Sequence, residues 1–499
     1  MSNDNNQKNL IETAVDLHKN GQINKALNLY LELIKTEENN PQLLFLLGTA
    51  YVQLEKTEQG INYLERSLSI KPDNASAHSN LGNALKNLNR YEEALTSFDK
   101  AINLNPNFAD AYSNRGVILQ EMRRYDEALQ SYDRAIEINP NHFFSHGNRG
   151  ITLKDLNRYD EALNSYDRAI EINPNFVEAY NNKGNALKDL KRYEEALYNY
   201  RKVFDLKPEY EYNLGRVLHF SMIICDWSNY NKLNEKINTD LEKKIKVMEP
   251  FSFLGISDNP EHAKNAAEIF VKNKVTKNLE VEPITKKYDH KKPRIGYFSG
   301  DFHDHPVLQL MMDVFKNHDK TKFDIFGFSY GAEKNDKWRI EVIKYFNQFK
   351  DIHKVSDKEV LDITRNLELD IAIDLSGLTG NPRSGLFSSR VAPIQINYLG
   401  YPGTIGADYM DYIIADEIII PKENFKHYFE KVLYLPDCYQ PNMECRDISK
   451  KEFKRSDFGL PERAFIYCSF NNNYKITPDI FEIWMKILNN VHNSVLWIL

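Results

Sequence analysis

Cysteine is scarce in this sequence, and the few cysteines are not arranged for cross-linking. The 499-residue chain has four, none of them in C-x-x-C spacing: Cys225, Cys438, Cys445 and Cys468. Scattered cysteines of this kind indicate neither a disulfide framework nor a zinc site. Long apolar runs are also missing, because no stretch reaches about 18 uninterrupted apolar residues and the polar N-terminus has no apolar leader. We therefore expect a soluble protein that resides in the cytoplasm.

A strongly basic surface is absent too. The formal net charge is −7, and Lys and Arg are not clustered in the way that counterion release from nucleic acid requires. The sequence therefore does not indicate a general nucleic-acid binder. Charged residues make up 27% of the chain and hydrophobic residues 42%, which is ordinary for a soluble globular protein. The length allows about two to four domains.

The sequence does contain a repeat. Between residues 76 and 208 one pattern recurs four times at a constant interval, the one that separates Gly82 from Gly116. Each copy has a glycine, an alanine inside E-E-A-L or D-E-A-L, and a closing proline. The recurring residues are Gly82, Gly116, Gly150 and Gly184, then Ala94, Ala128, Ala162 and Ala196, and finally Pro106, Pro140, Pro174 and Pro208. A fixed period of about 34 residues indicates a solenoid of stacked units.

Each unit is predicted to form two helices. Apolar and small residues recur at helical spacing in two runs, which a turn such as N-R-Y separates and a proline closes. Small residues suit the crossing of the two helices, and four aromatic side chains are expected to fill the gap beside the next unit: Phe98, Tyr132, Tyr166 and Tyr200. The units resemble tetratricopeptide repeats. We predict a disordered lead over 1–8 and about six repeats over 9–211.

A second recurring residue suggests binding. One asparagine stands two positions before each glycine, on the first helix of each pair: Asn80, Asn114, Asn148 and Asn182. In a repeat of this kind the first helix lines the concave surface, so these amides are expected to form a ladder inside the superhelix. An asparagine side chain offers two donors and an acceptor, which suffice to hold a peptide backbone without recognising its side chains. The alternative is a helix-capping or solvated polar position.

The chain changes character after the repeats. Residues 212–290 are predicted to be helical, to cap the solenoid and to connect it to the next domain. Over 291–457 short apolar strands alternate with amphipathic helices, which indicates a parallel sheet with helices on both faces. Strands are predicted at 294–299, 323–329, near 351–355, and at 371–375, 394–399 and 412–416, with helices at 307–317, 335–347 and 356–367. Ligands of such sheets bind beyond the carboxyl ends of the strands.

The loop S-G-D-F-H-D-H-P after the first strand carries the candidate catalytic residue. His305 stands before Pro306 at a predicted helix start, and a histidine titrates near neutrality, so it suits a base or a group that polarises a substrate. The alternative is a histidine that only caps the helix. His303 and His305 have no third ligand nearby, so we predict no metal site. The loops 375–382 and 399–407 contain small residues that let backbone amides approach a ligand, and turn chemistry explains them equally well.

The last segment, 458–499, is predicted to begin a second nucleotide-binding lobe. A strand at 464–470 leads through N-N-N-Y-K-I-T-P to a helix at 479–490 and a final apolar run. Lys475 lies at the mouth of that helix, where its charge adds to the helix dipole in binding phosphate. A surface lysine without a ligand is the alternative.

From residue 212 onward the chain resembles the O-linked N-acetylglucosaminyltransferase family, which joins a tetratricopeptide superhelix to a two-lobed GT-B catalytic domain. The matching stretches include I-C-D-W, P-F-x-F-L-x-x-S-D-N-P, R-I-G-Y-F-S-G-D-F-x-x-H-P, A-P-I-Q-x-x-Y-L-G-Y-P-G-T and F-N-N-N-Y-K-I-x-P, where x marks a position that does not match. The resemblance implies an α-solenoid followed by an α/β GT-B domain whose first Rossmann-like lobe is complete and whose second is only begun. It also implies inverting transfer of a sugar from UDP-GlcNAc to Ser or Thr of acceptor proteins, without a metal or other cofactor.

The resemblance further implies roles for single residues. His305 matches the active-site histidine of the family, which is proposed as the proton acceptor. Lys475 matches the lysine that holds the UDP phosphates, and Asn472 falls where many members carry a glutamine near the nucleotide. The repeated asparagines match the amides that hold the acceptor peptide inside the superhelix.

The C-terminus departs from the family. The sequence stops at Leu499, inside an apolar strand and soon after the F-G-L-P motif that ends at Pro461. Because a parallel strand needs neighbours on both sides, we expect a truncated second lobe that lacks most of the donor site, and no sugar transfer by the 499-residue chain. Two other functions stay open: a protein-binding scaffold with a vestigial transferase lobe, and a transferase that uses another nucleotide sugar such as GDP-fucose. The sequence identifies neither the acceptor proteins nor the oligomeric state.

Overall fold

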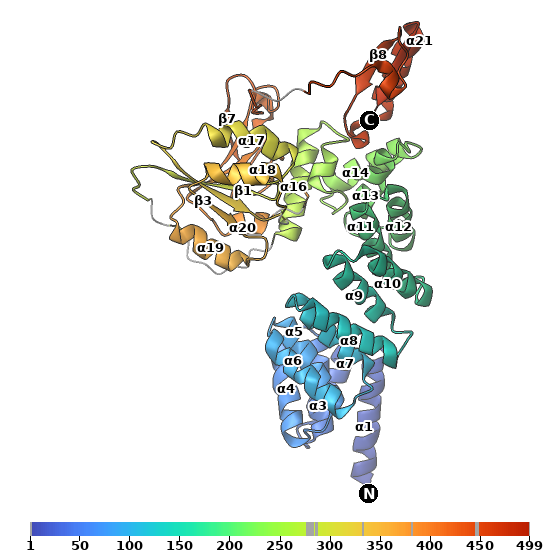
Figure 1. Ribbon diagram of the computed structural model, residues 1–499. Helices are drawn as coiled ribbons and strands as arrows, with labels where there is room; N and C mark the ends of the chain where they lie inside the picture. The colour runs from blue at the N-terminus through green and yellow to red at the C-terminus, as the bar shows by residue number, and fades with distance from the viewer. Residues whose placement is uncertain are drawn as a thin grey trace. The chain divides into compact units, whose positions relative to one another are not determined.

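The computed structural model describes residues 2–275, 284, 288–331, 334–380, 383–444 and 449–498. It divides into two compact units, Met1–Lys207 and Pro208–Leu499 (Figure 1). The last two residues of the predicted loop 375–382 lie outside the described residues, as does Cys445. In the described part of the chain, no helix combines the length and the apolar character needed to cross a membrane.

The described residues of the first unit form twelve helices, and each odd-numbered helix packs against the even-numbered helix that follows it. Six helix pairs agree with the predicted number of repeats. The N-terminus differs from the predicted disordered lead over 1–8, because α1 already begins at Ser2. The helices are α1 Ser2–Lys19, α2 Ile23–Leu33, α3 Pro41–Gln53, α4 Thr57–Ile70, α5 Ala75–Asn87, α6 Tyr91–Leu104, α7 Ala109–Glu121, α8 Tyr125–Ile138, α9 Phe143–Asp155, α10 Tyr159–Ile172, α11 Val177–Asp189 and α12 Tyr193–Leu206.

Glycine marks the place where the two helices of a pair come closest. A Cβ atom on Gly116 would lie 2.6 Å from the ring of Tyr132, and one on Gly150 would lie 2.6 Å from the ring of Tyr166. Both rings are fully buried. They therefore fill the space that the glycine leaves within their own pair. The prediction placed these rings beside the next unit and did not include this contact.

The first helices of successive pairs also contact one another. Contacts join α3 with α5, α5 with α7, α7 with α9, and α9 with α11. Helices that stay close from repeat to repeat lie at the inner radius of a solenoid, so these first helices form its inner surface. Each of the four recurring asparagines is the sixth residue of its helix, in α5, α7, α9 and α11, and all four are half-buried.

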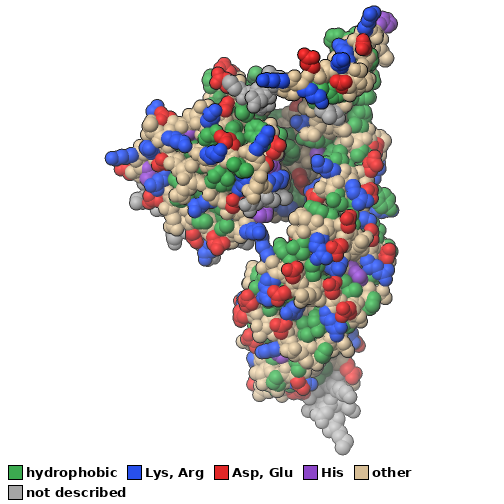
Figure 2. Space-filling view, viewed as in Figure 1, with side chains coloured by type: hydrophobic (Ala, Val, Ile, Leu, Met, Phe, Trp, Pro, Cys, Tyr) green, Lys and Arg blue, Asp and Glu red, His purple; other side chains and the backbone are tan. Residues whose placement is uncertain are grey.

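The outer surface of the solenoid carries repeated ion pairs. At the start of α6, α8, α10 and α12 an arginine pairs with a glutamate three residues later, with N–O distances of 2.6 to 2.7 Å: Arg90 with Glu93, Arg124 with Glu127, Arg158 with Glu161, and Arg192 with Glu195. Such exposed pairs stabilise a fold only weakly. They do intersperse positive and negative side chains, as the face in Figure 2 shows.

The second unit opens with four helices in the segment predicted to be helical. They are α13 Asn213–Ile223, α14 Tyr230–Glu242, α15 Pro250–Phe253 and α16 Pro260–Lys274. Asn259 caps α16, since its side-chain oxygen accepts hydrogen bonds from the backbone N–H groups of Glu261 and His262. Through Ala267 and Val271, α16 joins the hydrophobic core of the sheet that follows.

That sheet is parallel, and its described strands run in the order β3-β2-β1-β4-β5-β6-β7. Helices α17 and α18 pack on the face that carries Tyr297, whereas α16, α19 and α20 pack on the face that carries Phe298 (Figure 1). The predicted α/β domain with helices on both faces is confirmed. The elements are β1 Arg294–Ser299, α17 Pro306–Lys316, β2 Asp324–Ser329, α18 Lys337–Val342, β3 Gln348–Asp351, α19 Asp357–Asn366, β4 Ile371–Asp374, α20 Ser384–Ser388, β5 Ile394–Tyr398, β6 Tyr412–Ala415 and β7 Lys431–Tyr434.

The last segment forms a sheet of its own. Strands β8 Phe465–Ser469 and β9 Ser494–Ile498 pair in parallel, and α21 Pro478–Asn490 lies between them in the chain. These strands do not join the larger sheet. The predicted strand, loop, helix and final strand are therefore present, and the second lobe that they would begin stays a prediction.

Candidate functional site

The candidate site lies where the carboxyl ends of the strands meet. β1 and β4 are neighbours, but the chain proceeds from β1 to β2 and β3 on one side, and from β4 to β5, β6 and β7 on the other. Ligands of open α/β sheets bind in the crevice at such a reversal of strand order. The loop after β1, which carries His305, and the loop that begins at Leu375 after β4 flank this reversal.

Three loops of this edge touch one another. The backbone N–H of Gly300, after β1, donates to the hydroxyl of Ser376, after β4, at 3.4 Å. The carbonyl oxygen of Leu375 approaches Gly400, after β5, so closely that a Cβ atom there would lie 2.3 Å from it. Only glycine permits this approach. The small-residue loops that the sequence singled out therefore bring the ends of β1, β4 and β5 together.

His305 is the N-cap residue of α17, and its side chain is 38% exposed. Its Nδ1 accepts a hydrogen bond from the backbone N–H of Val307 at 3.3 Å, and the carboxylate of Asp301 lies 3.7 Å from the same nitrogen. Burial lowers the pKa of the imidazole; Asp301 opposes this shift, and the positive charges of His303 and Lys334 add to it. The ring is therefore mainly neutral near pH 7.

The two contacts of Nδ1 require different tautomers. The Val307 N–H needs a lone pair on Nδ1, which leaves the proton on Nε2. A hydrogen bond to Asp301 needs a proton on Nδ1, which frees the lone pair of Nε2 to accept a proton. The geometry thus shows His305 as a helix cap, because 3.7 Å is too long for a hydrogen bond to Asp301. The role of His305 as a base stays a prediction, and Asp301 is the residue that would favour it.

His303, the other histidine of this loop, has a different neighbour. Its Nε2 lies 3.3 Å from the Nζ of Lys334, and its ring centroid lies 5.7 Å from that of His305. Among the residues that the structure describes, no group of three or more His, Cys, Asp or Glu side chains is arranged to hold a metal ion.

Asp374 anchors the loop after β4. It is buried, and its Oδ1 accepts a hydrogen bond from the backbone N–H of Ser376 at 3.0 Å. Burial raises the pKa of this carboxyl from 3.8 to about 6, although hydrogen bonds from the N–H groups of Ser376 and Gly377 act in the opposite direction. The carboxyl group therefore titrates close to neutrality beneath the candidate site.

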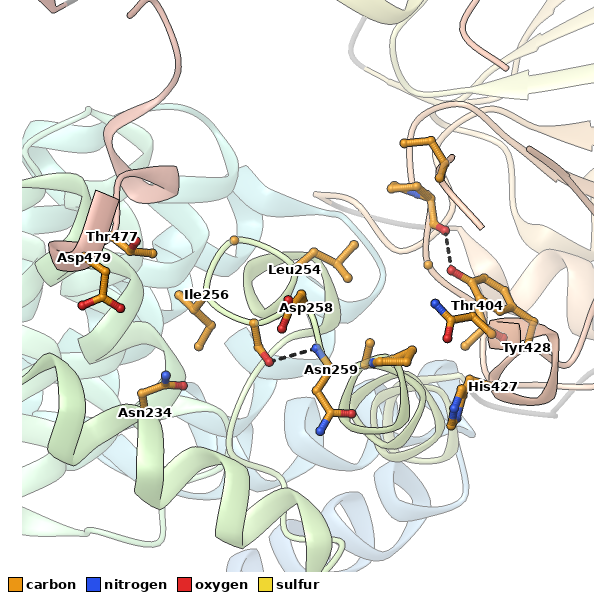
Figure 3. Close-up of a pocket in the computed structure, with 18 of the residues that line it drawn as sticks. Asn234, Leu254, Ile256, Asp258, Asn259, Thr404, His427, Tyr428, Thr477 and Asp479 are labelled. Carbon is orange, nitrogen blue, oxygen red and sulfur yellow. Dashed lines mark hydrogen bonds between the residues drawn. The ribbon is translucent and has the colours of Figure 1, made fainter. Parts of the chain in front are cut away.

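A cavity of 940 Å³ opens beside the loop after β5 (Figure 3). Figure 3 shows Leu254, Asp258 and Asn259 in its middle, with Thr404, His427 and Tyr428 on one side, and Asn234, Thr477 and Asp479 on the other. The walls thus come from α14, the loop before α16, the loops that follow β5 and β6, and the start of α21. The loop after β5 connects this cavity to the residues around His305.

A buried carboxyl group holds the cavity wall after β5 in place. Glu430 accepts hydrogen bonds from the hydroxyl of Thr404 at 2.7 Å and from the backbone N–H of Ile405 at 2.6 Å. Nearby, the hydroxyl of Tyr428 donates to the carbonyl of Pro402 at 3.2 Å (Figure 3). Burial raises the pKa of Glu430, and the two donors limit the rise. Residues 428–430 therefore fix the shape of the loop.

The predicted nucleotide-binding residues lie on the loop after β8. Asn472 precedes the short 3₁₀ helix Asn473–Lys475, and both Asn472 and Lys475 are exposed. Lys475 stands shortly before the start of α21, as predicted, and its Nζ lies 5.9 Å from the centroid of the Tyr474 ring. Within the described residues, no hydrogen bond, ion pair or ring contact joins His305 to Asn472 or Lys475.

The repeated asparagines use their side chains unequally. Asn80 donates from Nδ2 to the hydroxyl of Thr49 in the preceding repeat at 2.9 Å, and Asn182 accepts from Asn181 at 3.3 Å. The side chains of Asn114 and Asn148 have no hydrogen-bond partner among the described residues. Two of the four amides are therefore free to bind a ligand on the inner surface.

Several polar residues of the site were not predicted individually. Asp301 lies beside His305, and Glu430 holds the loop after β5 through Thr404. The cavity is lined by Asp258, Asn259 and Asp479, among others. The S-D-N-P motif, which includes Asp258 and Asn259, was recognised in the sequence but was not given a role. No sequence pattern indicated that Glu430 would be buried against a loop 25 residues earlier.

Comparison with known proteins places most of the second unit in one family. A model of glycosyl transferase family 41 matches residues 224–442 and 448–499. Tetratricopeptide repeat models match the solenoid at 48–89, 82–122, 109–142, 131–164, 150–191 and 177–210.

Two plant proteins and one bacterial structure are similar to this chain. The probable UDP-N-acetylglucosamine–peptide N-acetylglucosaminyltransferase SEC of Arabidopsis thaliana is 32% identical over 305 residues, which cover 57% of this chain and 31% of the relative. The probable enzyme SPINDLY of the same plant is 32% identical over 206 residues, which cover 40% and 22%. The chain thus spans about a third or less of the length of these relatives.

The bacterial structure is an O-GlcNAc transferase mutant from Thermobaculum terrenum, with a TM-score of 0.51 and 19% identity. The match covers 78% of this chain and 68% of the bacterial one. At this identity the likeness shows a common fold, a helical solenoid followed by a parallel-sheet domain.

Proposed function

Because this chain belongs to glycosyl transferase family 41, we propose that its protein transfers a sugar from UDP-GlcNAc to a Ser or Thr hydroxyl of a polypeptide held along the solenoid. One observation carries the proposal: His305 lies beside Asp301 at the reversal of strand order, inside the segment that the family model matches. A hydroxyl nucleophile loses its proton as it attacks, so a base that is neutral near pH 7 suits the reaction.

In the proposed reaction the acceptor oxygen attacks C1 of the sugar while the bond between C1 and the diphosphate oxygen breaks. The configuration at C1 inverts, and UDP leaves. The hydroxyl proton passes to Nε2 of His305 in the tautomer that donates from Nδ1 to Asp301. The carboxylate of Asp301 then stabilises the positive charge on the imidazole.

The donor would be held from the second sheet. The charge of Lys475 and the N-terminus of α21 favour a diphosphate in the loop after β8, and Asn472 offers an amide beside it. Positive charge from these groups supports a reaction without a metal or other cofactor.

The test of the catalytic role is sugar transfer by the full-length gene product from UDP-GlcNAc to a Ser- or Thr-containing peptide. His305→Asn keeps a good helix cap but removes the base, so we expect transfer to fall by about 10²- to 10⁴-fold. His353→Asn, at an exposed histidine that bonds the carbonyl of Tyr330, is the control. Transfer by His305→Asn at the rate of this control would contradict the assignment.

Binding of the donor is tested separately with UDP alone. Lys475→Ala should weaken UDP affinity. Lys486→Ala, at an exposed lysine of α21 that pairs with Glu482, should leave it unchanged. Equal affinities of the two variants would show that Lys475 does not hold the phosphates.

Acceptor binding is attributed to the repeated asparagines. Asn114→Ala and Asn148→Ala should each weaken binding of an extended peptide by about 1 kcal/mol, because one amide contact is lost. Asn175→Ala, in an exposed turn of the same unit, is the matched control. Unchanged peptide affinity in both test variants would make the ladder a structural feature.

A second candidate function is a protein-binding scaffold, which the unpartnered amides of Asn114 and Asn148 would serve equally well. Peptide binding without transfer by the full-length gene product, from either UDP-GlcNAc or GDP-fucose, would favour the scaffold. Transfer from GDP-fucose alone would support a transferase with a different donor.

A further inference from the structure

The repeat formed by α9 and α10 differs from the other repeats of its kind. Phe143 and Phe144 begin α9, whereas the same two positions hold Ala and Ser in α5, Ala and Asp in α7, and Val and Glu in α11. The position of Gly147 is also unusual, since it holds Ser or Asn in those three helices.

These departures assemble an aromatic cluster, formed by Phe143, Phe144 and Phe176. The ring centroids of Phe143 and Phe144 lie 4.1 Å apart, and that of Phe176 lies 5.0 Å and 5.5 Å from them. A Cβ atom on Gly147 would lie 2.9 Å from the Phe176 ring, so the glycine makes room for it. Although the ring of Phe144 packs against those of Phe143 and Phe176, Phe144 remains 53% exposed.

The cluster lies next to the asparagine ladder. Phe144 and Asn148 stand four positions apart on α9, so their side chains share one face of that helix. The α9 helix belongs to the inner surface, because it contacts the first helices before and after it. The amide of Asn148 has no hydrogen-bond partner among the described residues. An exposed ring and a free amide therefore lie side by side on the surface proposed to hold the acceptor.

The neighbouring repeats place carboxylates on either side of the ring. Asp110 in α7 and Glu178 in α11 occupy the position that Phe144 holds in α9, and both are exposed. Asp110 accepts from His142 at 2.9 Å, yet its side chain remains 69% exposed. Along the inner surface, one apolar spot thus stands between two negative charges.

We propose that this aromatic cluster anchors one large aliphatic or aromatic side chain of the extended acceptor polypeptide, and that basic residues on either side of this side chain are favoured. The inference rests on the proposed function, in which the asparagines hold the backbone of the same polypeptide. Rigid, partly exposed aromatic rings are the side chains that most often dominate binding at protein surfaces, and the carboxylates select the neighbours of the anchor by charge.

The test uses fluorescence anisotropy with labelled extended peptides that differ at one central residue, Leu or Ala, flanked by Lys. The wild-type protein should bind the Leu peptide about 10-fold tighter, as expected for burial of one such side chain. Phe144→Ala should abolish this preference, and so should Phe144→Ser, which introduces the residue found at this position of α5. Tyr198→Ala, which removes a ring that is 58% exposed on α12, should leave the preference intact.

Two further arms separate this inference from the proposed function. Asn148→Ala should weaken binding of the Leu and Ala peptides equally, and exchange of the flanking Lys for Glu should weaken binding to the wild-type protein. Equal binding of the Leu and Ala peptides to the wild-type protein would overturn the anchor while leaving the ladder in place. No binding of any peptide would overturn both. A dimer in sedimentation that Phe144→Ala dissolves would also overturn the inference, because the cluster would then hold a second copy of the chain.

Discussion

The buried carboxyl of Asp374 predicts how the stability of the second unit depends on pH. Its pKa in the folded protein is raised to about 6, against 3.8 for an unperturbed aspartate. The folded state therefore binds the proton more tightly than the unfolded state. The stabilisation from this proton is fully present below pH 3.8 and is lost as the pH rises through about 6.

The size of the effect follows from the shift. Each pKa unit corresponds to about 1.36 kcal/mol, so the free energy of unfolding should lose about 2 to 3 kcal/mol between pH 4 and pH 7 from this group alone. Asp374→Asn removes the titration. The unfolding free energy of the wild-type protein minus that of this variant should therefore fall by that amount from pH 4 to pH 7.

Urea unfolding followed by tryptophan fluorescence measures this difference. All four tryptophans lie in the second unit, so their emission reports that unit and not the solenoid: Trp227, Trp338, Trp484 and Trp497. Denaturation curves at intervals from pH 4 to pH 7 give the free energy of unfolding for each variant by linear extrapolation.

Asp416→Asn is the control for the same substitution at the same sheet edge. Hydrogen bonds from the backbone N–H groups of Tyr439 and Ile419 lower the pKa of Asp416. A lowered pKa contributes stability that is present above the unfolded value and is lost only as the pH falls through the folded value. The difference between this variant and the wild-type protein should thus stay nearly constant from pH 4 to pH 7. Constant differences for both variants would refute the reasoning about Asp374.

Two further predictions concern packing. Gly150→Ala should destabilise the solenoid by about 1 to 3 kcal/mol, because its Cβ atom would meet the buried ring of Tyr166; thermal unfolding followed by far-UV circular dichroism measures this, and an unchanged transition would contradict the close contact. Glu430→Gln should speed hydrogen exchange in the loop after β5, because one amide oxygen cannot replace the carboxylate that accepts from both Thr404 and Ile405. Exchange at the wild-type rate would mean that other contacts hold the loop.

The solenoid could be predicted from the sequence because its contacts are local. The recurring glycine of a repeat meets an aromatic ring on the second helix of the same unit, as Gly82 meets Phe98. The sequence of one repeat therefore contains most of the residues that pack against one another. The residues against which each ring packs were harder to predict. Sequence spacing alone does not distinguish a ring that fills its own pair from one that faces the next unit.

In the large sheet, the pattern identified the interior strands and failed at the edges. β1, β2, β4, β5 and β6 have apolar residues on both faces, as expected for buried parallel strands. The edge strands β3 and β7 are half-exposed, and their sequences Q-F-K-D and K-V-L-Y give no comparable signal. The sequence therefore placed β3 a few residues too late, and β7 was not predicted.

The arrangement of the site depends on contacts that no local pattern encodes. The loop of Lys475 is held against the helical region, since the ring of Tyr474 lies 4.9 Å from that of His219 and Asn473 donates to the carbonyl of Ile223 at 3.3 Å. The ring of Phe481 on α21 lies 5.0 Å from Trp227. The I-C-D-W motif, which the sequence singled out without a role, thus supplies the tryptophan on which α21 packs. Helix α13 and the turn that follows it therefore set the position of the proposed phosphate-binding loop, and Trp227→Ala should weaken UDP binding, as titration with UDP would measure.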